Sequence, residues 1–485
     1  MTSTGGCAAD PPRLRLGAAA AELCEKLQCR VPVVLAGMGG VSRSELVGAV
    51  SEAGGFGFLG MVRESASLIW REVESLRERG YRNFGVNIIP AATSHALLEQ
   101  QIDTIVELHV PVVALFWDID ERVVARFRDA GIMVVYQVGS VDEAIAAERA
   151  GAEIIVAQGV EAGGHVRGVR PLGTLLPAIV AAVRTPVLAA GGLASGGDLV
   201  TALALGGSGI MLGTALMATD ESFAHAYHKQ RLLAATGNDT VLTDAFHINW
   251  PPGAPVRVLK SEVTDGRLPP DRVAPSSVIG AEEGRPIYLN STDSPLRSMT
   301  GDFAAMALYA GTGVGRVDQI VPAARRIATI GQQAEAMLRL SEAEEVPETS
   351  SAVCYMGEFC GAYAGTLDEA EQAAELGGLA ASLEGLLRAS LPLDANGEPP
   401  FPTSSHSYAA WVLALRGLAG RTARPATTAA TPAAIAERLT LLIPQMPEGY
   451  ARQVLLKLRG TLDAENAIHF TRALQLAGSR DASGR

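Results

Sequence analysis

The sequence predicts an α/β fold in which eight parallel strands close into a (β/α)8 barrel of the TIM type. Eight short apolar runs recur between residues 33 and 212, and each is followed by a segment with helical spacing of apolar residues. Strands that alternate with helices form a parallel sheet, and eight is the number that closes such a sheet into a barrel. The expected strands are 33–37, 56–60, 83–88, 112–116, 132–136, 153–157, 186–190 and 208–212.

The composition of these runs supports each assignment. They consist mostly of β-branched residues, Leu, Phe and Ala, bounded by Gly, Pro, Asn or Asp, which is typical of strands buried on both faces. Intervening segments such as 42–54 and 140–151 begin with Ser, carry Glu near the first turn and end on Gly, which are helix start and stop signals. An open doubly wound sheet is the alternative. It expects GxGxxG after the first strand, and AGMGGVSRSE at 36–45 matches that fingerprint poorly.

The remainder of the chain divides by composition. Prolines and polar turns between 237 and 298 predict an excursion that packs over the barrel near the mouth of the site. The acidic stretch SEAEEVPETSS predicts a linker, and helical spacing returns beyond it. The expected organisation is an N-terminal tail at 1–29, the barrel domain at 30–340, the linker at 341–351 and a helical C-terminal module of unknown function at 352–485.

Composition and charge exclude several classes of protein. The 485 residues are 48% hydrophobic and 19% charged, which is incompatible with general disorder. The net charge of −12 and the lack of a basic stripe argue against binding to nucleic acid or anionic membranes. No apolar stretch is long enough to span a bilayer, and the first 30 residues do not form a signal peptide. Five cysteines fit neither a metal site nor a disulfide framework, so we expect reduced thiols in the cytoplasm and no bound metal.

Glycine pairs predict a phosphate site at the C-terminal ends of the last two strands. Gly191 and Gly192 follow the seventh strand, and the helix that opens near Ser195 is expected to offer free backbone N–H groups. Gly213 and Thr214 repeat the arrangement after the eighth strand. Adjacent loops of this kind form the usual phosphate site of these barrels, so a phosphate-bearing cofactor is expected. The alternative is that the glycines form tight turns and nothing more.

The loop after the sixth strand contains the leading catalytic candidate. Gly163 and Gly164 leave no side chain next to His165, so its imidazole is predicted to stand at the barrel mouth beside a flat cofactor. A neutral imidazole there can take a proton from a carbon acid or orient a substrate anion. His247, in the excursion, is a second candidate, and Glu161 could act as an acid or base or form a salt bridge. A purely structural role is the alternative for each of them.

Residues 157–168, AQGVEAGGHVRG, resemble the hallmark motif of nitronate monooxygenases. Five further blocks are similar to that family in the same order, and together they cover about residues 30–340. These are AGMGGVSRSELVGAVSEAGGFGFLG, FGVNI, AAGGLASG, LGTALMA and ALYAGTGVGRV. Two positions differ from the family pattern: Gly37 stands where Pro is usual, and Thr312 stands where many members have Gln. Nothing from about residue 345 onward resembles the family.

The resemblance implies non-covalent FMN with its ring over the barrel mouth, and it places the family's catalytic histidine at His165. Together with the glycines already singled out, the expected cofactor-binding residues are Met38, Asn87, Gln137, Gln158, Gly163, Gly164, Gly191, Gly192, Met211, Leu212, Gly213 and Thr214.

The implied reaction is oxidation of a nitronate or nitroalkane by dioxygen to a carbonyl compound and nitrite, with His165 as base or substrate-orienting residue. Two alternatives stay open. An NAD(P)H-dependent flavin reductase, of the enoyl-acyl carrier protein or quinone type, shares the EAGGH motif. A flavin-binding biosynthetic partner is the other, in which the C-terminal module docks a protein.

Overall fold

The computed structural model describes residues 17–268 and 277–342. Eight parallel strands form a closed barrel, so the predicted fold class is confirmed. Each barrel strand overlaps one of the predicted runs. The strands are β1 (Val33–Leu35), β2 (Phe56–Gly60), β3 (Phe84–Asn87), β4 (Val112–Phe116), β5 (Met133–Val138), β6 (Ile154–Gln158), β8 (Val187–Ala190) and β9 (Gly209–Leu212).

Closure of the barrel places alternate side chains of every strand in a common interior. β1 pairs in parallel with both β2 and β9, which joins the two ends of the sheet. Because strand side chains alternate between faces, one set points inward and the other faces the surrounding helices. The inward set is Val34, Phe56, Phe58, Val112, Ala114, Val135, Ile154, Val156, Leu188, Ala190 and Met211.

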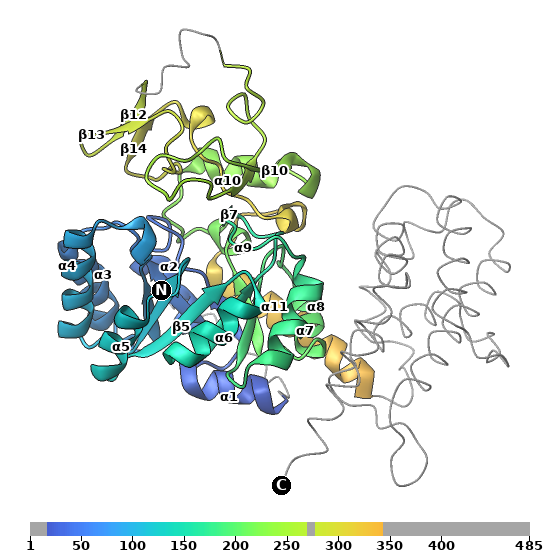
Figure 1. The fold of residues 1–485 in the computed structure, drawn as a ribbon. Helices are drawn as coiled ribbons and strands as arrows, with labels where there is room; N and C mark the ends of the chain where they lie inside the picture. Colours follow the sequence, from blue (N-terminus) through green and yellow to red (C-terminus); the bar gives the residue numbers. More distant parts are fainter. Residues whose placement is uncertain (1–16, 269–276, 343–485) are drawn as a thin grey trace, which may run out of the picture. The chain divides into compact units, whose positions relative to one another are not determined.

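Helices follow the strands in the predicted alternation. They are α2 (Ser44–Glu52), α3 (Ala66–Glu78), α4 (His95–Glu107), α5 (Glu121–Asp129), α6 (Val141–Ala150), α7 (Leu172–Ala182) and α8 (Gly196–Ala204). Figure 1 shows helices such as α3, α4, α5 and α6 on the outside of this barrel. The start and stop signals act as expected in α6, where the Ser140 hydroxyl accepts a hydrogen bond from the N–H of Glu143. Gly151 ends that helix at φ 110°, a left-handed conformation that favours glycine.

The predicted N-terminal tail is wrong for part of its length. Residues Ala18–Leu27 form helix α1, in which Leu23 and Leu27 are almost fully buried. They belong to the same apolar cluster as Val34 and Phe56 of the barrel interior. The helix forms because an apolar face is available to cover the interior near the start of the strands, so tertiary packing decides its structure.

The excursion at 237–298 contains strands that the sequence did not reveal. Two three-stranded sheets form, with the orders β10-β11-β7 and β13-β12-β14. Their strands are β10 (Thr240–Thr243), β11 (Val256–Leu259), β12 (Val278–Glu282), β13 (Arg285–Tyr288) and β14 (Met299–Gly301). The strand β7 (Gly164–His165) comes from the loop after β6 and pairs antiparallel with β11. The excursion is therefore linked by backbone hydrogen bonds to the loop that carries the catalytic candidate.

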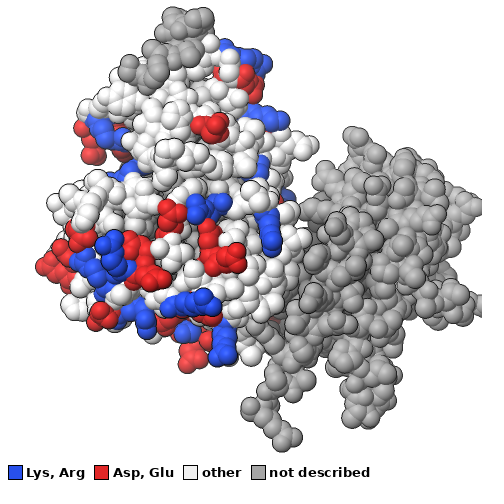
Figure 2. Space-filling view, in the orientation of Figure 1, with Lys and Arg blue, Asp and Glu red and all other residues white. Residues whose placement is uncertain are grey.

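The remaining described elements connect the barrel to its last helix. These are α9 (Thr214–Met217), α10 (Ala226–Leu233) and α11 (Ala323–Glu342). Helix α11 includes the first two residues of the predicted linker, and the rest of the linker and the C-terminal module lie outside the described residues. Within the described ranges, no helix is both long and apolar enough to cross a bilayer. Figure 2 shows acidic and basic side chains interspersed over the barrel face that it presents.

Candidate functional site

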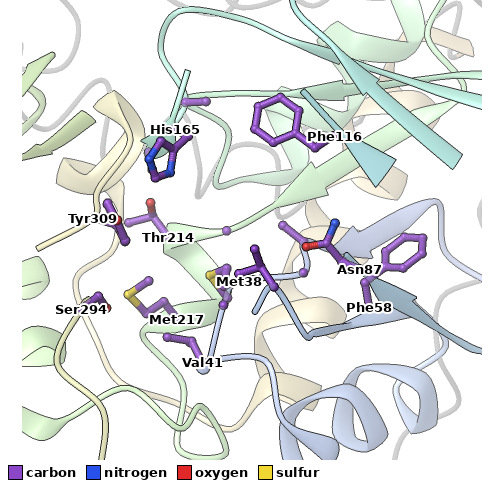
Figure 3. Close-up of a pocket in the computed structure, with 18 of the residues that line it drawn as sticks. Met38, Val41, Phe58, Asn87, Phe116, His165, Thr214, Met217, Ser294 and Tyr309 are labelled. Atoms are coloured by element: carbon purple, nitrogen blue, oxygen red, sulfur yellow. The ribbon is translucent and has the colours of Figure 1, made fainter. Parts of the chain in front are cut away.

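A cavity of about 490 Å³ lies at the C-terminal ends of the barrel strands. Its floor includes three small side chains, Ala36, Ala114 and Ala190, which leave space above the barrel interior. Asn249 and Trp250 of the excursion form part of the opposite wall. This volume lies within the range of about 300–1,000 Å³ usual for small-molecule sites. Figure 3 shows side chains from several strands and from the segment around Tyr309 gathered around this space.

The residues predicted from sequence converge on this cavity. His165 lines it, as does every predicted cofactor-binding residue except Leu212. Side chains alternate along β9, so Met211 faces the barrel interior whereas Leu212 does not, and a cofactor contact of Leu212 stays a prediction. Gln137 also lines the cavity, but from within β5, because that strand runs two residues further than the predicted 132–136.

Two amide side chains of the cavity wall are engaged with the backbone. Gln158 donates from Nε2 to the carbonyl of His165 at 2.8 Å and accepts at Oε1 from the N–H of Arg167 at 3.1 Å. Its amide therefore fixes the course of the loop that carries His165. Asn87 donates from Nδ2 to the carbonyl of Ala114 at 3.1 Å, across to the next strand.

The imidazole of His165 is enclosed by aromatic rings. It stacks on Trp250 with ring centroids 3.4 Å apart and an angle of 20° between the planes. The rings of Trp117 and Tyr309 lie 6.3 Å and 6.1 Å away. Burial, together with the positive charge of Arg63, lowers the pKa of His165 well below its ordinary value of 6.5. The imidazole is therefore neutral at neutral pH.

The Nε2 atom of His165 is buried and has no hydrogen-bond partner among the described residues. A buried polar atom without a partner is costly, because it has lost its hydrogen bond to water. At a cavity wall, such an atom is positioned to bind a ligand. The Oγ atom of Ser294, which lines the same cavity, is in the same condition.

The glycine loops have the expected backbone but a different pattern of hydrogen bonds. Gly191 and Gly192 adopt φ values of 116° and 68°, which residues other than glycine rarely adopt. Two of the N–H groups near Ser195 are not free. The carboxylate of Asp198 accepts hydrogen bonds from the N–H groups of Ala194 and Ser195 at 2.8 and 2.9 Å, because a Ser-x-x-Asp capping box closes this helix end.

Free space at Gly213 and Gly164, which both line the cavity, is consistent with a bound cofactor. A Cβ atom on Gly213 would have the sulfur of Met38 as its nearest neighbour, at 3.7 Å, and one on Gly164 would meet nothing within 4 Å. These glycines are therefore not required by packing against the protein. Together with the small residues of the floor and the unpartnered buried atoms, they fit a flat, phosphate-bearing molecule.

The weaker catalytic candidates have other positions. His247 is exposed and does not line the cavity. Glu161 accepts a hydrogen bond from the N–H of Leu172 at 3.0 Å and so caps the start of α7. In the described part of the chain, no group of three His, Cys, Asp or Glu side chains could hold a metal ion.

Sequence reasoning missed three residues of the site. Arg63, which lines the cavity, and Trp117, whose ring lies near that of His165, follow β2 and β4 closely, where position at a strand end was a usable signal. Trp250 lies in the excursion, 85 positions from His165 in sequence, and no local pattern predicted their contact.

The fold and the cavity together define a (β/α)8-barrel enzyme that acts on a small molecule. The chain belongs to the nitronate monooxygenase family: the model of the family described as "Nitronate monooxygenase" matches residues 21–97 and 90–333. The protein is accordingly an oxidoreductase of the monooxygenase class. Curated relatives include a probable nitronate monooxygenase of Staphylococcus aureus, 33% identical over 267 residues, which are 46% of this chain and 75% of the relative.

Two solved structures are similar to this chain. Nitroalkane oxidase from Streptomyces ansochromogenes has 30% sequence identity and a TM-score of 0.54, and the match covers 67% of this chain and all of that one. FabK from Thermotoga maritima has 27% identity and a TM-score of 0.56, with 66% and 97% covered. Both comparisons leave about a third of this chain unmatched.

Proposed function

We propose that this protein oxidises nitronates, or the nitroalkanes from which they form, to a carbonyl compound and nitrite with FMN as cofactor and dioxygen as oxidant. The observation that supports this most strongly is the placement of His165. His165 lines a ligand-sized cavity and its Nε2 is buried without a partner, in a chain of the nitronate monooxygenase family. Membership of the family and the similarity to a nitroalkane oxidase support the class of substrate.

His165 works on the substrate as a neutral group. Its Nε2 accepts a proton from the carbon next to the nitro group, or donates a hydrogen bond to an anion that has already lost that proton. The stack on Trp250 limits rotation of the ring, so the reacting nitrogen keeps its direction. The aromatic rings around the imidazole exclude water from this side of the cavity.

FMN is proposed to occupy the floor and the glycine-lined end of the cavity. Met38, Gly191, Gly192, Gly213 and Thr214 would hold it there. Bound FMN would take electrons from the substrate and pass them to dioxygen, and the protein's share is orientation and electrostatics. Because the N–H groups of Ala194 and Ser195 are already used by Asp198, the phosphate is expected to rely on the backbone of the glycine pairs.

The cofactor assignment is tested by colour and by one substitution. Purified protein should be yellow and should release FMN on denaturation. The Gly213→Val variant should fold normally yet hold less flavin, because the valine side chain enters space that the protein leaves open. Gly173→Ala, at an exposed glycine with nothing within 4 Å of the added Cβ, is the matched control and should keep its flavin. Colourless wild-type protein that takes up no added FMN would contradict the assignment.

Anaerobic bleaching of the flavin distinguishes the proposed function from its rivals. A nitronate should bleach the flavin, and admission of air should then yield nitrite and a carbonyl compound. Bleaching by NADH or NADPH, with none by a nitronate, would instead indicate the flavin reductase. Bound flavin that no donor bleaches would favour a flavin-binding partner protein.

The domain organisation and location of the protein are also proposals. The barrel domain, ending near residue 340, is proposed to be the catalytic unit, and the C-terminal module at 352–485 is proposed to bind a protein partner. A cytoplasmic location is proposed on the ground that Cys24 and Cys29 are both free thiols. Affinity capture with the isolated barrel and with the full chain would test the partner.

A further inference from the structure

Arg63 differs from the other charged residues that line the cavity. The carboxylates of Glu282 and Asp293 both pair with Arg285, at 2.8 and 2.9 Å. Glu64 pairs with Arg43 at 3.3 Å. Among the described residues, no carboxylate lies within ion-pair distance of the Arg63 guanidinium. Of the two arginines that line the cavity, Arg285 is paired with carboxylates, and Arg63 has no carboxylate partner among the described residues.

The guanidinium of Arg63 is nevertheless held in place. One terminal nitrogen donates to the carbonyl of Asn249 at 2.7 Å, and the other donates to the hydroxyl of Thr292 at 3.2 Å. Both partners are neutral, and both come from the excursion. A guanidinium has five N–H donors, so these two bonds leave three for a ligand. The backbone of Arg63 is left-handed, at φ 57°, a conformation that residues other than glycine rarely adopt.

Arg63 also lies in the electrostatic surroundings of the catalytic candidate. Its positive charge contributes to lowering the pKa of His165, and it acts in the same direction on the pKa of Tyr309. Its hydrogen-bond partner Asn249 directly precedes Trp250, whose ring stacks on His165. The guanidinium and the imidazole therefore face one ligand space from neighbouring parts of the wall.

We propose that Arg63 binds a planar, two-oxygen anionic group of the substrate and thereby orients it toward His165. The two N–O bonds of a nitronate have the same planar geometry as a carboxylate, and the arginine fork matches such a group with parallel hydrogen bonds. The inference rests on the proposed function and deepens it, since it names the group that recognises the anion. The anion is the nitronate itself or a carboxylate elsewhere on the same substrate.

Arg63→Gln and Arg63→Lys test this, with Arg149→Gln as a control at an exposed arginine outside the cavity. The probes are ethyl nitronate, a nitronate that carries a carboxylate at its other end, propionate as a dead-end ligand and neutral propionamide. Loss of a hydrogen bond to a charged group corresponds to roughly a 10- to 100-fold change. We expect Arg63→Gln to raise the KM for ethyl nitronate and the dissociation constant of propionate by about that factor.

The pattern of effects distinguishes anion binding by Arg63 from a purely structural role, in which Arg63 only holds the cavity wall in place. Propionamide binding and flavin content should be unchanged in Arg63→Gln, and Arg63→Lys should restore part of the affinity because it keeps the charge but lacks the fork. Equal losses for propionate and propionamide would mean that Arg63 merely holds Asn249, which would overturn the proposal. An effect confined to the substrate with two anionic groups would assign Arg63 to the carboxylate.

The experiment distinguishes failure of the Arg63 proposal from failure of the proposed function. If the wild-type protein oxidises no nitronate, the proposed function fails, whereas propionate binding still reports on Arg63. If wild-type protein and Arg63→Gln oxidise both nitronates with equal KM and bind propionate equally, the proposed function stands and the role of Arg63 is refuted.

Discussion

His165 and Trp250 form a stacked pair with ring centroids 3.4 Å apart, although one residue follows a barrel strand and the other lies in the excursion. The indole covers one face of the imidazole, and the Nε2 atom on the ring edge makes no hydrogen bond to the described residues. The pair thus buries the histidine without using its reacting nitrogen.

His165→Ala should leave folding and flavin content close to wild type and lower turnover. Removal of a general acid or base typically costs about 10²–10⁴-fold in rate. The loss should be larger with a neutral nitroalkane than with a preformed nitronate, which already lacks the proton. His165→Asn should restore little, because an amide is no base at neutral pH. Steady-state kinetics with both substrates measure this, and wild-type rates in the Ala variant would make His165 structural.

Trp250→Ala should move the acid limb of the pH profile to higher pH. Burial lowers the pKa of His165, and only the neutral imidazole can act as a base, so wild-type kcat/KM for a neutral nitroalkane should fall only at a pH well below 6.5. Without the indole the imidazole is more hydrated, and its pKa should rise toward 6.5. Trp250→Phe, which keeps a ring, should stay closer to wild type. Coincident acid limbs in all three proteins would show that the stack does not control this pKa.

His228 should make the fold sensitive to acid. It is fully buried, and its Nε2 lies 3.1 Å from the carbonyl of Tyr309. Burial lowers its pKa from 6.5 to about 4, so protons bind the unfolded chain more tightly in this interval. Stability should be complete above pH 6.5 and should decline as the pH falls toward 4, by up to about 3 kcal/mol. Denaturant melts of wild type and His228→Gln check this, since the variant should show a shallower decline.

A chain that ends near residue 345 should still fold and hold flavin. Every described barrel strand and every residue that lines the cavity lies before that point. Size-exclusion chromatography and the flavin spectrum of the truncated protein provide the measurement, with the full chain as reference. An insoluble or colourless truncation would place the C-terminal module within the catalytic unit.

The barrel was predictable because its strands are buried on both faces and so appear in the sequence as unbroken apolar runs. The same logic of strand ends led to His165, Asn87 and the glycine pairs. Helix α1 escaped prediction because its stability depends on packing against the barrel interior, which no local pattern reports. The two-residue strand β7 is too short to leave a periodicity, and its partner β11 lies in the excursion.

The site was predictable where function requires a particular backbone and unpredictable where it depends on contacts distant in sequence. Gly191 and Gly192 stand out as a pair, and their left-handed backbone explains it. Trp250 and Thr292 reach the cavity through turns whose course no motif fixes. Asp198 is an intermediate case: the Ser-x-x-Asp pattern was visible, but its capping role was overlooked in favour of free N–H groups.

The ladder between β7 and β11 has a consequence for protein engineering. In this barrel the excursion and the loop that carries His165 contribute strands to one small sheet, in which Val256 pairs with His165. Grafting the excursion of a relative onto this chain would therefore also change the position of His165. A chimera that exchanges residues 159–168 and 237–298 together should retain activity, whereas exchange of the excursion alone should change specificity at the expense of rate.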